Sequence, residues 1–282
     1  MYNLRYHIAS LVALFLALAL GLILGGLVVQ SGAVSRQQNA LVKGLEKQFA
    51  ELREENSGLS ADNEVLDAFG STLTDEWVRG RLEGKTVIVV TNGGRASGGE
   101  AALEAVEGAG GAVAGVVLLQ PDLGLEDVDV RSQVESLVSS DGELLESVVT
   151  SLVAEWASAE TTRPVTAALV EAGALRIDGF TDGMDVVGLL DLAMTQGKVE
   201  PAGIALATAF QEFGVGVAAQ VEGEDPGITQ AADDAGISAF DTLGNDVGSY
   251  TLVALFTGSK PGIYGTGEGA NAAFPDPPEI TP

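Results

Sequence analysis

The sequence predicts an α/β protein with a single N-terminal transmembrane helix, a coiled-coil stalk and a Rossmann-like α/β domain with a mainly parallel sheet. Three observations lead to this fold class. An uncharged apolar run opens the chain, leucines then recur every seven residues, and short β-branched runs finally alternate with alanine-rich stretches. The predicted parts are a membrane anchor at 1–30, a coiled coil at 31–75, an α/β domain at 84–266 and a disordered tail at 267–282.

The apolar run covers 22 residues from Ile8 to Val29 without a charge. As a helix it would be about 33 Å long, enough to cross a hydrocarbon core of roughly 30 Å. A cleaved signal peptide is the alternative, because Ser31-Gly32-Ala33 resembles a cleavage site. Signal peptides have shorter apolar regions of about 7–15 residues and a more basic leader, so we expect a retained membrane anchor.

Small residues recur at every fourth position of the anchor, starting at Ala9. Such a stripe lets two membrane helices approach closely, although Ala and Gly are common in any membrane helix. The stripe therefore predicts a helix-packing face. Its predicted packing residues are Ala13, Ala17, Gly21 and Gly25.

The charges that flank the anchor do not settle its orientation. Lys and Arg near a membrane helix mark the cytoplasmic side. Only Arg5 precedes the helix, whereas Arg36, Lys43, Lys47 and Arg53 follow it. Most of these later cations are interleaved with glutamates on the predicted coiled coil, which weakens the rule here.

A heptad repeat follows the anchor, with leucine at each d position and apolar residues or asparagine at the a positions. Four consecutive heptads meet the minimum for a coiled coil, and asparagine at a specifies register and a low oligomer number. The alternative is an amphipathic helix packed on its own domain. Gly44 and Gly58 weaken either helix by about 1 kcal/mol each relative to Ala. The predicted seam consists of Val42, Leu45, Phe49, Leu52, Asn56, Leu59, Asn63 and Leu66. Its partner is a second copy, giving a homodimer, or a different membrane protein.

From Gly84 onward, strands are predicted to alternate with helices, as in α/β units around a mainly parallel sheet. The tail is expected to be disordered because four of its last eight residues are proline. The predicted strands are Lys85–Val90, Ala112–Leu119, Val186–Leu192, Val215–Val221 and Ile237–Asp241. The predicted helices are Gly99–Gly108, parts of Val130–Ser158, Thr161–Glu171, Pro201–Phe213, Ile228–Ala235 and Asp246–Phe256.

Charge and composition exclude several functions. Residues 1–70 carry a net charge of −2, so −24 of the whole-chain −26 lies in residues 71–282. A domain this acidic repels phosphate backbones, which excludes nucleic-acid binding. It attracts cations or basic partners, although solubility or adaptation to salt explains the same acidity. The chain has no cysteine, so it has no disulfide, thiolate zinc site or cysteine nucleophile.

No segment makes a convincing ligand site. The glycine-rich turn Thr91–Glu100 lacks the dinucleotide spacing, and Glu100 stands where a P-loop has its lysine. Asp178, Asp182 and Asp185 lie close in sequence but do not follow the EF-hand pattern. Turn chemistry explains their Asp-Gly pairs without a metal.

Catalytic and metal-binding side chains are scarce. The only histidine, His7, lies at the membrane edge, so no Ser-His-Asp triad can form in the globular part. Copper(I) prefers thiolate and thioether ligands, and Met184 and Met194 are the only methionines besides the initiator. Such methionines more commonly fill cores. We therefore predict no enzyme activity, no cofactor and no metal-binding residue.

Three segments resemble the actinobacterial MctB family, and the resemblance covers nearly the whole chain. They are MYNLRYHIASLVALFLALALGLILG, KTVIVVTN and GSYTLVALFTGSKPGIYGTGEGA. The resemblance implies a role in copper transport or copper homeostasis in the cell envelope, and an extracytoplasmic position for the domain at 84–266. A branch of this family, SteB, is described instead as an envelope partner of SteA that helps to regulate septal peptidoglycan cleavage.

Two functional hypotheses follow. In the first, the protein supports copper export or tolerance as a non-catalytic oligomeric component of the membrane. In the second, it is a SteB-like coiled-coil scaffold that docks a partner and regulates cell-wall hydrolysis during cell division. One membrane helix cannot enclose a pore, and the soft ligands expected for copper are missing. Copper therefore enters through the family resemblance alone.

Overall fold

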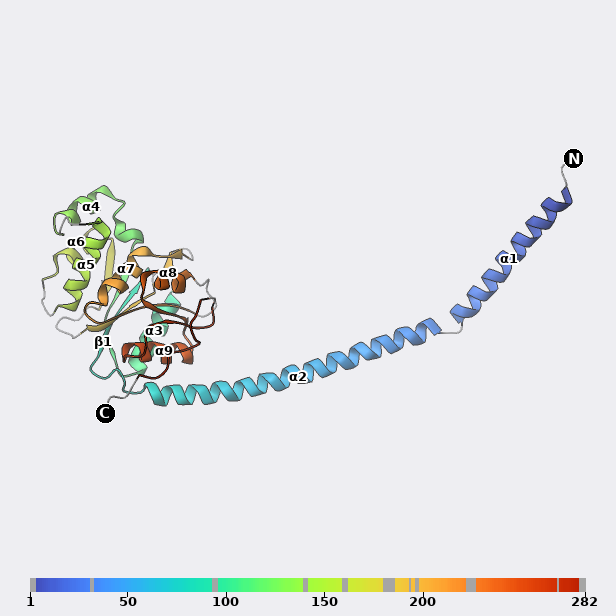
Figure 1. Cartoon of the computed structure of the whole chain (residues 1–282), viewed down its shortest axis with the longest axis horizontal. Coiled ribbons are helices and arrows are strands. Elements are labelled where there is room, and N and C mark those ends of the chain that lie inside the picture. Colours follow the sequence, from blue (N-terminus) through green and yellow to red (C-terminus); the bar gives the residue numbers. More distant parts are fainter. Residues whose placement is uncertain are drawn as a thin grey trace. The chain divides into compact units, whose positions relative to one another are not determined.

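The computed structural model describes residues 4–30, 33–92, 96–138, 142–158, 162–179, 186–192, 194–195, 198–221, 227–267 and 269–278 (Figure 1). The chain forms two compact units, Met1–Asp67 and Ala68–Pro282. The first unit is helical, and the second is a mixed α/β domain.

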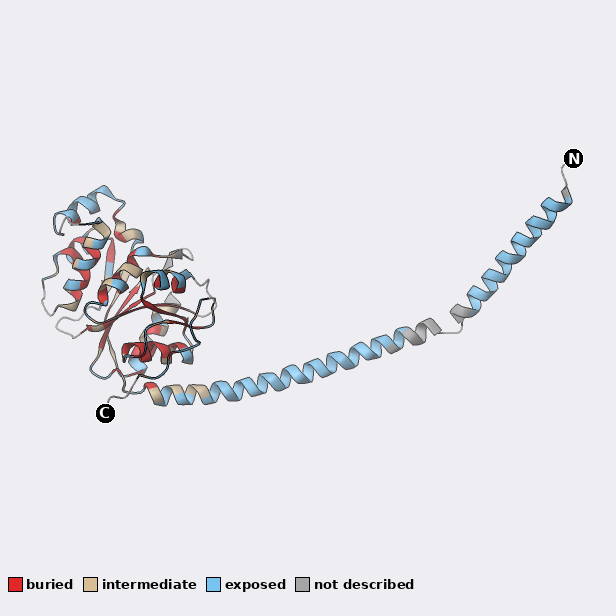
Figure 2. Cartoon of the chain, viewed as in Figure 1, coloured by how far each residue is buried: buried red, intermediate tan, exposed pale blue. Residues whose placement is uncertain are grey.

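Two long helices open the chain. Helix α1 spans Leu4–Gln30, and α2 continues for 46 residues over Ala33–Val78, a length of about 69 Å. Figure 2 shows that both are exposed over most of their length. Within α1, Arg5–Leu27 is a candidate membrane span of 23 residues with a mean hydropathy of 2.7. The single apolar N-terminal helix expected from the sequence is therefore present.

A mainly parallel sheet forms the centre of the α/β domain, as predicted. Its seven strands lie in the order β3-β2-β1-β4-β7-β8-β9, and every pair is parallel except β2 with β3. The strands are β1 Thr86–Thr91, β2 Ala112–Leu119, β3 Leu175–Asp178, β4 Val186–Asp191, β7 Val215–Val221, β8 Ser238–Leu243 and β9 Ile263–Tyr264. A separate antiparallel pair joins β5 Met194–Thr195 to β6 Lys198–Val199.

Helices cover both faces of the sheet, so its strands are buried on both sides. Successive residues of β1 alternate between the two layers, with Ile88 and Val90 in one core and Val87 and Val89 in the other. The first core includes residues of α4 Val128–Glu135, α5 Leu144–Ala157, α6 Pro164–Glu171, α7 Pro201–Phe210, α8 Gly227–Ala235 and the short 3₁₀ turn η1 Pro121–Gly124. The second includes residues of α3 Ala96–Gly108, α9 Asp246–Phe256 and the last turn of α2.

Helix α7 packs closely against the sheet at two glycines. Gly216 in β7 faces the backbone of α7, and a Cβ at this position would overlap the carbonyl oxygen of Ala207. At the C-terminal end of the neighbouring strand β4, Asp191 likewise lies against Gly203 of α7. Both glycines therefore permit an approach that no larger residue allows.

The structure differs from the sequence-based prediction at the tail. Residues 269–278, expected to be disordered, are held against the domain by specific contacts. Asn271 exchanges hydrogen bonds with Ile263, donating from its backbone N–H and accepting with its side chain. The Tyr250 hydroxyl donates to the Pro275 carbonyl at 3.2 Å, and Ser259 Oγ donates to the Asp276 carbonyl at 2.7 Å. Proline removes backbone donors but not acceptors, so a proline-rich segment can still be fixed through its carbonyl groups. Residues 279–282 lie outside the described part.

Candidate partner-binding surfaces

The predicted coiled-coil residues all lie on α2 and are all exposed in the single chain. Six of them are apolar, and these side chains are 51–64% exposed: Val42, Leu45, Phe49, Leu52, Leu59 and Leu66. The two polar members, Asn56 and Asn63, are also exposed. An uncovered row of large apolar side chains on one helix is typical of a surface that binds another protein.

The leucine repeat extends one heptad further than the sequence analysis took it. Leu73 follows Leu66 at the same spacing and is 53% exposed. Trp77 occupies the next a position after Gly70. The seven-residue spacing alone could have identified Leu73.

Trp77 belongs to an aromatic cluster at the end of α2. Its ring centroid lies 4.4 Å from that of Tyr250, and the Arg81 guanidinium carbon lies 4.0 Å above the Trp77 ring. Phe274 contacts Tyr250 edge-on at 5.8 Å. Burial, followed by the negative charge of Asp276, raises the pKa of Tyr250, while Arg81 opposes this shift. The cluster joins the end of α2 to α9 and to the tail.

The predicted membrane-packing residues all lie on α1 and are exposed: Ala13, Ala17, Gly21 and Gly25. A Cβ added at Gly21 or Gly25 would meet nothing within 4 Å. The two glycines therefore leave space on one side of α1, as a close helix contact requires. Packing through this stripe stays a prediction.

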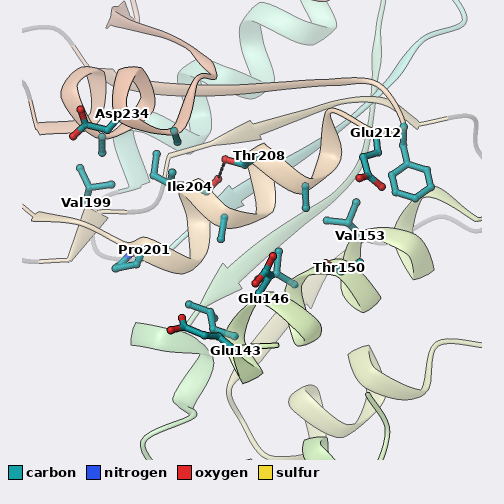
Figure 3. A pocket seen from close by; sticks show the side chains of 17 residues that line it. Glu143, Glu146, Thr150, Val153, Val199, Pro201, Ile204, Thr208, Glu212 and Asp234 are labelled. Carbon is teal, nitrogen blue, oxygen red and sulfur yellow. Dashed lines mark hydrogen bonds between the residues drawn. The ribbon is translucent and has the colours of Figure 1, made fainter. Parts of the chain in front are cut away.

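A groove of about 730 Å³ lies between α5, α7 and α8 (Figure 3). Its floor is apolar, and four carboxylate side chains belong to its lining: Glu143, Glu146, Glu212 and Asp234. Sequence reasoning did not find this site, because its residues come from three separate helices. The one local signal is the small outward face of α7, where Ala205, Thr208 and Ala209 share one side of the helix.

The C-terminal ends of parallel strands, where α/β proteins commonly bind ligands, hold the chain's own carboxylates here. Asp241 of β8 accepts hydrogen bonds from the backbone N–H groups of Thr266 at 3.0 Å and Gly267 at 2.7 Å. Glu200 accepts another from the backbone N–H of Asp122 at 2.7 Å. These N–H groups could otherwise bind an anion, but carboxylates of the chain already occupy them.

The two candidate ligand segments weighed in the sequence lie partly outside the described residues. Residues 93–95 of the glycine-rich turn lie outside the described part, and Glu100 is exposed on α3. Asp178 ends β3 and pairs with Arg176 at 3.2 Å on the surface. Asp182 and Asp185 lie outside the described part, so their relation to Asp178 stays untested.

A candidate membrane span in the same chain as a mixed α/β domain is consistent with a single-pass membrane protein. Comparison with protein families shows which family this is. Residues 1–275 match the family described as copper transport outer membrane protein, MctB, and the chain belongs to this family. The resemblance inferred from the sequence is thus confirmed, and the family implies a membrane protein related to copper transport. No curated protein and no solved structure matches the chain.

The donor atoms of the chain fit copper poorly. Within the described residues, no three His, Cys, Asp or Glu side chains gather into a group that could hold a metal ion. The chain has no cysteine, and His7 lies in the apolar helix α1. Met184 lies outside the described part, and Met194 is in the two-residue strand β5. Carboxylates, which suit harder cations, are the abundant donors.

We expect the full chain, in detergent, to take no Cu(I) from a colorimetric chelator at micromolar concentrations, because thiolate donors are absent and thioether donors are few. A variant carrying Met184→Leu and Met194→Leu is the matched control and should behave like the parent chain. Retention of one equivalent of copper by the parent, lost in this double variant, would contradict the expectation and identify a thioether site.

Proposed function

We propose that this protein is a non-catalytic, membrane-anchored component of a copper-handling assembly in the cell envelope, with its α/β domain on the extracytoplasmic side. Its activity is to pair with another coiled-coil helix through α2 and so to hold the domain at a defined place in the assembly. The observation that carries this proposal is the row of exposed apolar side chains on α2, from Val42 to Leu73.

Pairing is favoured because these side chains are exposed in the single chain. Burying apolar surface stabilises an association by about 25 cal/mol for each Å² removed from water. A leucine or valine that becomes fully buried therefore contributes roughly 1.5–3 kcal/mol before the entropy cost of association. Asn56 and Asn63 occupy a positions of the same seam, where asparagine specifies the register of the pairing and a low oligomer number.

Cross-linking through introduced cysteines tests the pairing without interference, because the natural chain has no cysteine. We expect full-length Asn56→Cys, in its membrane, to form a covalent homodimer with a bifunctional maleimide. Ala61→Cys is the matched control, because position 61 lies on the outer face of the same helix and should cross-link several-fold less. The products are separated by denaturing electrophoresis.

The products also identify the partner. A dimer formed by Asn56→Cys alone supports pairing of two copies of this chain. With a maleimide–benzophenone reagent, whose second end inserts into C–H bonds of any neighbour on illumination, an adduct of another mass from Asn56→Cys alone supports a coiled coil with a different membrane protein. Equal cross-linking at positions 56 and 61 would contradict a seam and favour an unpaired helix that collides at random.

The second candidate function is a SteB-like scaffold that docks a partner and regulates septal cell-wall hydrolysis. The observation that favours it is the poor donor set for copper, since a scaffold needs no metal site. Both candidates use the same pairing helix, so cross-linking cannot distinguish them. The phenotype of a deletion strain does. Increased copper sensitivity with normal septation supports the first, and abnormal septation with unchanged copper sensitivity supports the second.

A further inference from the structure

The groove on the α/β domain has a shape set by the side chains of its middle helix. Helix α7 lies between α5 and α8 and presents Ala205, Thr208 and Ala209 to the groove (Figure 3). Because these side chains are small, the side chains of the neighbouring helices extend beyond them. The result is a trough along α7 rather than a flat helical face.

The floor of the trough is apolar and partly open to solvent. Val149 and Val153 of α5 are buried, whereas Ile204 of α7 is only half-buried. Phe213, just after α7, is 49% exposed at one end of the trough. An apolar floor that remains accessible gains free energy when a partner covers it.

The polar lining of the trough carries charge of one sign. Glu143 and Glu146 contribute carboxylates from the α5 side, Asp234 from α8, and Glu212 from the end of α7 (Figure 3). All four side chains are exposed, and none of the described residues that line the trough is basic. Asp234 accepts a hydrogen bond from Gln230 at 3.0 Å. A cationic partner would therefore find opposite charges on both sides of the apolar floor.

The length of the trough fits a short helix. On α5, the lining residues run from Leu145 to Val153, which corresponds to about 12 Å or two helical turns. On α7, the lining residues Pro201, Ile204, Ala205, Thr208 and Ala209 follow the spacing of a single helix face. A partner helix with apolar residues at i, i+3 or i+4, and i+7 would match this length.

We propose that this trough binds a basic amphipathic helix of a partner protein. Its apolar side chains lie over α7, and its Lys or Arg side chains reach Glu146 on one side and Asp234 on the other. A second copy of the domain fits poorly, because residues 71–282 carry a charge of −24 and would place carboxylates against carboxylates. An anionic membrane surface is disfavoured for the same reason.

The probe for this proposal is a synthetic helical peptide of leucine and lysine with the leucines on one face, labelled for fluorescence anisotropy. A scrambled peptide of the same composition has the same charge but no apolar face. The full chain is used in nanodiscs of neutral lipid, and binding to empty nanodiscs is subtracted. We expect the amphipathic peptide to bind at least tenfold more tightly than the scrambled one.

Paired charge variants locate the binding. We expect Glu146→Gln with Asp234→Asn to weaken binding about five- to tenfold. Glu104→Gln with Glu107→Gln is the matched control, because it removes the same charge from exposed positions on α3, which packs on the other face of the sheet. This control should change the affinity less than twofold. Thr208→Lys, at an exposed position of the trough, should weaken binding at least tenfold.

Two results would overturn the proposal. Equal loss of affinity in the two double variants would mean that the peptide responds only to the overall negative field of the domain. Equal binding of the amphipathic and scrambled peptides would mean that the apolar floor is not used. All the substituted side chains are exposed, so loss of folding does not confuse the comparison.

Discussion

Replacing Leu52 with proline is expected to abolish pairing of α2. Proline removes one backbone hydrogen bond and clashes with the preceding turn, which costs about 3 kcal/mol or more inside a helix. Leu52 lies near the middle of the 46-residue helix and is one of the exposed seam leucines. The substitution therefore breaks the helix and removes an apolar contact at once. Cross-linking through Asn63→Cys in the same chain should fall to the level of an outer-face cysteine.

Leu52→Met is the matched control, because methionine keeps the helix and a similar apolar volume. It should retain most of the cross-linking. If Leu52→Pro cross-links as well as Leu52→Met, α2 does not pair through this seam, and the proposed function is contradicted.

The same two variants connect pairing to biology. In a deletion strain, the gene carrying Leu52→Met should restore the wild-type phenotype, and the gene carrying Leu52→Pro should not. If Leu52→Met restores copper tolerance and Leu52→Pro does not, the result supports a copper-handling assembly. If Leu52→Met restores normal septation and Leu52→Pro does not, with copper tolerance unchanged, the result supports the scaffold that regulates cell-wall hydrolysis.

A second large effect is expected from Gly216→Val in β7. A side chain at this position would overlap the carbonyl oxygen of Ala207, which belongs to the backbone of α7. Because the obstacle is backbone, it cannot turn aside as a side chain could. Overpacking of this kind costs about 3 kcal/mol, and in a domain of this size it lowers the melting temperature by about 6–12 °C.

Tryptophan fluorescence reports the thermal unfolding of the unit Ala68–Pro282, because this unit contains both tryptophans, Trp77 and Trp156. Gly99→Ala is the matched control, because a Cβ there meets nothing within 4 Å and Gly99 lies in helix α3. Alanine should stabilise that helix by about 1 kcal/mol. An unchanged melting temperature for Gly216→Val would mean that α7 does not approach β7 as closely as the structure places it.

The parts of the fold that could be predicted are those with a strong local pattern. Every residue of β1 is β-branched, and β2 is a continuous apolar run that contains three valines, as is typical of strands in a sheet covered on both faces. The observed bounds of helix α9 agree with the predicted range, and Asn245 caps its start by accepting a hydrogen bond from the backbone N–H of Gly248. The single apolar helix followed from length and the absence of charge.

Other elements depend on contacts that no local pattern contains. Strand β3 has four residues, two of them charged, and exists because it pairs with β2 at the edge of the sheet. The two residues of β9 likewise depend on pairing with β8. The trough between α5, α7 and α8 can be predicted only when the positions of these three helices are known. The small side chains on one face of α7 are its one local sequence signal.

The aromatic cluster of Trp77, Tyr250 and Phe274 has a consequence for any shortened version of this protein. It ties the residues where the domain begins to the residues where it ends, with α9 between them. The two boundaries of the folding unit are therefore not independent. A stop codon after Gly267 would strip Tyr250 of one aromatic neighbour and one hydrogen-bond acceptor, and would loosen the other end of the domain as well.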